Sequence, residues 1–209
     1  MSNITNISLK CLDIQTVSCY RLNNHLINCA GCTSLTYSQC GCGTLNVKHV
    51  TSCSFDDIAN QYIYADDFSN CSLYNCKNIN FNILEIYNCN FTSNSNLCLT
   101  CKNISGCKFE NNTDILINCI SIYSCTFLTN DNIHITAASV LSNAIEPGDG
   151  VYIYAQRVYE NWICGIWLLF IYCDVYSHNV YKNNHRFGHI ADGGLANNVL
   201  EGCVMVWNV

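Results

Sequence analysis

The chain has 209 residues, of which 50% are hydrophobic and only 11% are charged, and its formal net charge at pH 7 is -6. Its nine Lys and Arg residues are scattered without a basic run. This pattern excludes a basic patch of the kind that neutralises phosphates, so we expect no nucleic-acid partner. The length suits one large domain, and we expect a single domain over residues 1–209.

The first fifteen residues, MSNITNISLKCLDIQ, lack a basic segment followed by an apolar segment. We therefore expect no secretory signal. The longest apolar segment, residues 162–173, is bounded by Asn161 and Asp174 and is short for a membrane span. Eighteen cysteines in a chain without a signal favour free thiols in a reducing compartment such as the cytoplasm.

A four-residue phrase returns every 18 residues through the first two thirds of the chain. Its copies are SCSF at 52–55, NCSL at 70–73, NCNF at 88–91, GCKF at 106–109 and SCTF at 124–127. Stacking the chain in rows of 18 aligns the second residue of this phrase in one column without insertions. We expect that column to form a ladder in the core, made of Cys53, Cys71, Cys89, Cys107, Cys125, Asn143, Asn161, Asn179 and Asn197.

Within each row the apolar columns are two residues apart, as in Ile115, Ile117 and Cys119. A period of two predicts strands, whose alternate side chains face the core. Another column is rich in Asn and Asp, as at Asn96 and Asp114, and these residues tolerate the left-handed backbone of tight corners. The sequence therefore predicts an all-β parallel solenoid of about eleven to twelve 18-residue coils, without long inserted loops.

The handedness of the solenoid follows from a second column. A left-handed hexapeptide helix also has 18-residue coils, but it needs an aliphatic residue every six positions. Six places after the Ile115 column the residues are polar, as at Glu85, Asn103 and Ser121. This pattern favours the right-handed form, as does the general preference of parallel crossovers.

The phrases GCKFENN at 106–112 and HNVYKNN at 178–184 resemble the repeat of right-handed parallel β-helix proteins. In that repeat Asn or a small residue precedes the last inward hydrophobic residue, and Asn follows it. The resemblance covers essentially the whole chain and implies the fold. It implies little about function, because this fold hosts lyases, adhesins, tailspikes, filaments and ice-binding proteins.

Three interpretations of the cysteines compete. Free Cys is a small, well-buried hydrophobic residue that suits a narrow coil. Stacked neighbours also lie within the Cα range of a disulfide, although side chains in register point in parallel. The third interpretation is zinc, because Cys29, Cys32, Cys40 and Cys42 have zinc-like spacing. The register assigns Cys29 and Cys32 to inward columns of different strands, which favours packing, so we expect no metal.

No group of residues predicts catalysis. The acidic pairs at 56–57 and 66–67 are candidates for carboxylate catalysis or calcium binding, but they fall at corners, where solvated acids are common. Residues 148–150 indicate a turn. The polar cluster near the C-terminal end suits a capping role, and it consists of His185, Arg186, His189 and Asp192. We therefore expect no enzyme activity and no cofactor.

An outward-facing band of large apolar side chains is the main candidate for function. It consists of Tyr152, Tyr154, Tyr159, Trp162, Trp167, Leu168, Phe170 and Tyr172. Exposed aromatic patches of this size are typical of protein interfaces. We expect docking to another protein subunit, the same or different, through this band and the uncovered terminal coils. Stacking on a carbohydrate is the alternative.

These observations predict a non-enzymatic structural or assembly protein. The Asn-, Ile- and Cys-rich composition resembles structural proteins of large cytoplasmic DNA viruses, which implies a virion component. A self-stacking filament that resembles bactofilins is one alternative, and a carbohydrate-binding or carbohydrate-cleaving β-helix is another. Ser and Thr beside the ladder, as at Ser52 and Ser54, raise ice binding as a further alternative, although Gly106 and Lys108 interrupt that array.

Overall fold

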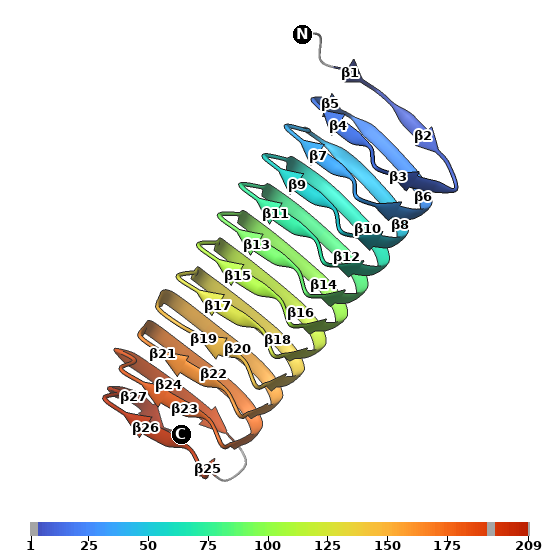
Figure 1. Ribbon diagram of the computed structural model, residues 1–209. Helices are drawn as coiled ribbons and strands as arrows, with labels where there is room; N and C mark the ends of the chain where they lie inside the picture. The colour runs from blue at the N-terminus through green and yellow to red at the C-terminus, as the bar shows by residue number, and fades with distance from the viewer. Residues whose placement is uncertain (1–3, 192–194, 209) are drawn as a thin grey trace.

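The eighteen-residue repeat folds as stacked coils. The structure is a computed structural model that describes residues 4–191 and 195–208. It is a parallel β-solenoid of about 10 turns, with 73% of the residues in strands (Figure 1). The rows of sequence predicted about eleven to twelve coils, but rows at both ends contribute only short strands. Within the described residues there is no helix of the length and apolarity that a membrane crossing requires.

All strand pairs are parallel, and within the described residues they form three sheets. The 14-stranded sheet contains β2 (Ser8–Lys10), β3 (Asp13–Gln15), β6 (His25–Thr33), β8 (Gly43–Thr51), β10 (Ala59–Ser69), β12 (Lys77–Tyr87), β14 (Ser95–Ser105), β16 (Thr113–Tyr123), β18 (Asp131–Leu141), β20 (Gly148–Tyr159), β22 (Ile166–Ser177), β24 (Arg186–Ala191), β25 (Leu195–Ala196) and β27 (Met205–Asn208). The 11-stranded sheet contains β4 (Ser18–Tyr20), β7 (Thr36–Ser38), β9 (Ser54–Asp56), β11 (Ser72–Tyr74), β13 (Asn90–Thr92), β15 (Lys108–Glu110), β17 (Thr126–Leu128), β19 (Ala144–Ile145), β21 (Trp162–Cys164), β23 (Val180–Lys182) and β26 (Val199–Glu201). The third sheet pairs β1 (Ile4–Thr5) with β5 (Leu22–Asn23).

Each central coil has three faces, as the coil of β16 and β17 shows. Ile115 and Ile117 point inward in the first half of β16, and Ile122 points inward in its second half. The alternation breaks between them, so the strand turns a corner. We call the first half of each long strand the first face, the second half the second face, and the short strand the third face. Phe127 supplies the inward side chain of the third face.

Left-handed backbone conformations make the corners. Asn96, Asp114 and Asn132 have positive φ, as their column predicted. Two further columns also have positive φ, at the corners that flank the third face, as at Ser124 and Thr129. These columns mix Asn and Gly, which are typical of this conformation, with Ser, Thr and Glu, which are not.

The core contains side chains that stack on their equivalents in the next coil. The rings of Phe91, Phe109 and Phe127 are parallel, with centroids 4.7 Å apart at each step. This distance matches the separation of neighbouring strands, about 4.8 Å. Aliphatic columns such as Ile115 and Ile117 are likewise fully buried. The repeat therefore specifies the fold because one coil-sized pattern buries the same surface many times.

The register slips by one residue near the C-terminal end. Val180 pairs with Val199, nineteen residues later. The N–H of Asn179 donates to Oδ1 of Asn198 at 3.0 Å, so Asn198 continues the ladder that we had assigned to Asn197. Asn197 is exposed and has a φ of 58°, which places it on the corner instead. The inserted residue could not be recognised in the sequence, because Asn197 and Asn198 are both asparagine.

Candidate interaction face

The outer side of the first face carries two straight columns of side chains. Strand register places neighbouring members of each column on adjacent strands. One column is Tyr62, Asn80, Cys98, Leu116, His134, Tyr152 and Phe170, and the other is Tyr64, Asn82, Thr100, Asn118, Thr136, Tyr154 and Tyr172. The two columns are therefore aromatic on β10 and again on β20 and β22, with mostly polar side chains between them.

Five of these side chains form what we call the aromatic cluster, on strands β18, β20 and β22. It consists of His134, Tyr152, Tyr154, Phe170 and Tyr172. The rings of His134 and Tyr152 stack with centroids 4.5 Å apart. Tyr154 lies 6.0 Å from Phe170 and 6.4 Å from Tyr172 between ring centroids. Tyr154 and Tyr172 are each 43% exposed, so this cluster presents contiguous rings to solvent.

The remaining members of the predicted band lie around the coil. Trp167 and Leu168 are at the start of β22, beside the aromatic cluster, and Trp167 is 53% exposed. Tyr159 ends β20 on the second face, and Trp162 begins β21 on the third face. The structure therefore groups six members of the band on or beside the first face and separates the other two from them.

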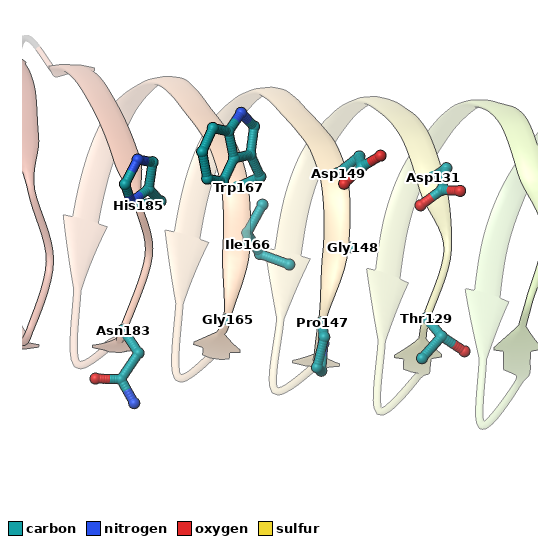
Figure 2. A pocket seen from close by; sticks show the side chains of 10 residues that line it. All are labelled: Thr129, Asp131, Pro147, Gly148, Asp149, Gly165, Ile166, Trp167, Asn183 and His185. Atoms are coloured by element: carbon teal, nitrogen blue, oxygen red, sulfur yellow. The ribbon is translucent and has the colours of Figure 1, made fainter.

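A depression opens at the corner where β18, β20, β22 and β24 begin (Figure 2). We call it the corner depression, and its volume is about 630 Å³. Its lining residues are Thr129, Asp131, Pro147, Gly148, Asp149, Gly165, Ile166, Trp167, Asn183 and His185. Asp131, Asp149, Trp167 and His185 occupy equivalent positions of successive coils, and Figure 2 shows them in one row on the same side.

Most of this depression lies outside the sites predicted from the sequence. The turn predicted at residues 148–150 is instead the start of β20, and Gly148 and Asp149 line the hollow. His185 had been assigned to a polar cap, and its ring instead stacks on Trp167 with centroids 4.0 Å apart. Asp192 of that cap lies outside the described residues. The signal that could have found the site is the column of Asp131, Asp149, Trp167 and His185.

The ladder positions show why Asn can replace Cys along one column. The N–H of Cys89 donates to Sγ of Cys107 at 3.4 Å, and the N–H of Asn143 donates to Oδ1 of Asn161 at 2.9 Å. Both residue types also donate to a backbone carbonyl 21 residues earlier, as Cys89 does to Phe68 at 3.4 Å. Either side chain therefore satisfies the buried backbone at this corner.

A second ladder of the same kind lies at the corner before the first face. The N–H of Cys76 donates to Oδ1 of Asn94 at 2.8 Å, and the N–H of Asn94 donates to Oδ1 of Asn112 at 2.9 Å. Cys40, which is buried in the same column, donates to the carbonyl of Ser38 at 3.3 Å. Cysteine thus serves as a hydrogen-bonding residue at both corners.

All eighteen cysteines are free in the structure. The four with zinc-like spacing do not converge. Cys29 is buried on the first face, Cys32 lies beside Cys53 with a 3.8 Å separation of their sulfurs, Cys40 is at a corner and Cys42 is exposed. In residues 4–191 and 195–208 no group of three His, Cys, Asp or Glu side chains is arranged to hold a metal ion.

The acidic pairs lie at the surface and bond to neighbours one coil away. Asp67 contacts Nδ1 of His49, and the carboxylate of Asp57 accepts from Asn75 at 3.4 Å. Ser52, beside the ladder, sits at a corner with a φ of 54°, whereas Ser54 lies in β9. The Ser and Thr residues on either side of the ladder therefore lie partly at a corner and partly on the third face.

Comparisons of the chain with protein-family models, with curated proteins and with solved structures find no match.

Proposed function

We propose that the protein is a non-enzymatic structural subunit that docks another protein subunit through the aromatic cluster. The observation that supports this proposal is the contiguous ring surface of His134, Tyr152, Tyr154, Phe170 and Tyr172 on three successive strands. Large aromatic side chains lose little conformational entropy on binding and dominate interface energetics. The rigid solenoid beneath them holds the rings in place before a partner arrives.

The simplest partner is a second copy of the chain, and sedimentation velocity over a range of concentrations tests it. We expect the wild-type protein to associate as its concentration rises. The double variant Tyr154→Ser, Tyr172→Ser should remain monomeric. The matched control is Tyr62→Ser, Tyr64→Ser, which changes the same two columns on β10, away from the aromatic cluster, and should associate normally. Monomeric wild-type protein at the highest concentration, or equal association of both variants, would contradict self-docking.

For the setting we propose a virion or another large particle assembled in the cytoplasm. The support for this setting is the Asn-, Ile- and Cys-rich composition together with eighteen free thiols, which suit a reducing compartment. A protein of this kind would contribute a stiff rod with a regular surface. Identification of the chain among the proteins of a purified native particle tests this setting.

A carbohydrate-binding role is the second candidate, and a different part of the first face favours it. A hollow of about 200 Å³ is lined by tyrosines, amides and a hydroxyl, and these residues include Tyr62, Tyr64, Asn80, Asn82 and Thr100. Tyrosine rings stack on sugar faces, while amides and hydroxyls bond sugar hydroxyls. A glycan array with the wild-type protein and the Tyr62→Ser, Tyr64→Ser variant tests this role. Absence of any glycan that requires these tyrosines would exclude it.

A further inference from the structure

Pro147, Gly148 and Gly165 line the corner depression. Pro147 cannot adopt the positive φ that Thr129 has at the equivalent corner, and it has no N–H to donate to the next coil. A Cβ on Gly148 would lie 2.1 Å from the carbonyl oxygen of Asn130, so the backbone approaches closely here. Gly165 has a φ of 70° at the next coil. Neither glycine adds a side chain to the lining of the depression.

One wall of the depression is the indole of Trp167. His185, from the following coil, stacks on one side of this ring with an interplanar angle of 15°. The opposite side is turned towards the preceding coil, where the equivalent residue is Asp149. Aspartate is too short to cover an indole. Trp167 is therefore held in place by His185 and keeps one ring face directed into the hollow, consistent with its 53% exposure.

The other end of the depression is anionic. Asp131 and Asp149 lie one coil apart, which is about 4.8 Å along the solenoid. Neither carboxylate has a hydrogen bond or an ion pair within the part of the chain that the structure describes, and the lining residues include no Lys or Arg. Other carboxylates on this surface do bond across coils, as Glu201 does with Lys182 at 3.3 Å. Two neighbouring unpaired carboxylates repel each other, and a cation between them relieves this repulsion.

We infer that the corner depression binds an organic cation of the class of an arginine or lysine side chain. The cationic group stacks on the free face of Trp167 and donates hydrogen bonds to the carboxylates of Asp131 and Asp149. A planar guanidinium satisfies both demands at once, because it stacks on aromatic rings and donates in parallel to carboxylate oxygens. A neutral sugar could use the ring but would leave the carboxylate pair without a counter-charge.

The inference deepens the proposed function, on which it rests for the origin of the cation. Trp167 and the aromatic cluster share strand β22, so one partner can cover both sites. The partner subunit would then place a basic side chain in the depression beside an apolar surface that covers Tyr154 and Tyr172. Charge pairs at the edge of an aromatic interface set its register and orientation.

Titration of the full-length protein with L-argininamide tests the inference, with L-citrullinamide as its neutral isostere and L-lysinamide as the second cation. The readout is the indole N–H signal of Trp167 among the three tryptophan signals in a nitrogen–proton correlation spectrum. We expect a saturable shift with argininamide and none with citrullinamide. If lysinamide binds with the same affinity as argininamide, the depression is a general cation site. If lysinamide binds more weakly than argininamide, the depression is a guanidinium site.

The carboxylates are tested with Asp131→Asn and Asp149→Asn, both exposed positions whose change should leave the fold intact. Each variant should weaken binding by about tenfold, which is the scale of a lost charge-assisted hydrogen bond. Asp174→Asn is the matched control, because it makes the same charge change at an exposed position on β22 away from the depression. Equal shifts with argininamide and citrullinamide, or equal affinity in all three variants, would overturn the inference.

This test is separate from the test of the proposed function. If argininamide fails to bind while Tyr154→Ser, Tyr172→Ser abolishes association, only the cation site is wrong. If argininamide binds as expected while the tyrosine variant associates normally, the docking proposal is wrong and the cation site stands alone.

Discussion

The backbone N–H of Cys125 donates a hydrogen bond to Oδ1 of Asn143, 2.9 Å away. This contact joins the stack of cysteines to the stack of asparagines along the same corner. Asn143 in turn donates from Nδ2 to the carbonyl of Ile122 at 3.1 Å. Cys and Asn therefore have the same structural role in this ladder. Each side chain accepts a hydrogen bond from the backbone of one coil and donates a hydrogen bond to the backbone of another.

This equivalence predicts how the ladder tolerates substitution. Asn143→Cys should change the free energy of unfolding by less than about 1 kcal/mol, because the thiol can accept from Cys125 and donate to Ile122. Asn143→Ala should cost about 2–4 kcal/mol, because it leaves a buried N–H and a buried carbonyl without partners. Urea unfolding of both variants measures the difference. Equal destabilisation by Cys and Ala would show that the position requires an amide.

The thiols should differ widely in reactivity. Burial raises the pKa of Cys76 to about 12, so almost none of this thiol is ionised at neutral pH. Cys42 is the exposed cysteine. Because the thiolate is the reactive form, a disulfide reagent should modify Cys42 first in the native protein and reach Cys76 only after denaturation. Peptide mapping after timed labelling measures the order, and native labelling of Cys76 at the rate of Cys42 would contradict the buried assignment.

His25 should make the N-terminal coils sensitive to acid. Its side chain is buried against the ring of Tyr37, with centroids 5.2 Å apart, and within the described residues neither ring nitrogen has a hydrogen-bond partner. Burial lowers the pKa of His25 from its ordinary value of 6.5. Below that value the unfolded chain binds a proton that the folded chain does not. The free energy of unfolding should therefore fall as the pH falls below 6.5.

The measurement is urea unfolding at about pH 7.5 and about pH 5, on either side of the ordinary histidine pKa. His25→Leu should lose less stability between these conditions than the wild-type protein does. His134→Leu, which changes a surface histidine of the aromatic cluster, should keep the wild-type dependence. An unchanged pH dependence in His25→Leu would show that other groups cause the acid sensitivity.

The tight backbone at the corner depression gives a further prediction. Gly148→Ala should destabilise the protein by about 1–3 kcal/mol, because the added Cβ meets the Asn130 carbonyl at 2.1 Å. Gly150→Ala is the control, since its Cβ would first meet the flexible Tyr152 side chain at 3.3 Å. Thermal unfolding of the two variants compares them. A Gly150→Ala protein that is the less stable of the two would contradict this account of the corner.

The fold could be predicted because each inward column requires the same kind of side chain in many successive coils. Ile115 and Ile117 are buried as their spacing of two predicted, and Asn96 has the positive φ that its column indicated. The positive φ of Glu160 and His178 could not be predicted, because neighbouring coils rather than intrinsic preference impose it. Asn197 was misplaced because nothing local distinguishes it from Asn198.

The candidate sites were only partly predictable for a related reason. Tyr154 and Tyr172 could be assigned to the surface from the alternation within their strands. Asp131 and Asp149 are isolated in the sequence, and they gain a common environment only through the stacking of coils. Gly148 also lines the hollow, and its close approach to the carbonyl of Asn130 is not apparent from a pattern of residue types.

Site-specific photo-crosslinking tests the central claim, that function resides on the aromatic cluster, most directly. A benzophenone amino acid placed at Tyr154 should, in the native source, link the chain to one defined protein subunit in high yield. The same amino acid at Tyr64, in the same column on β10, should give little of this product. Failure of the Tyr154 probe to form a protein adduct, or equal yield of the same adduct from both positions, would contradict the claim.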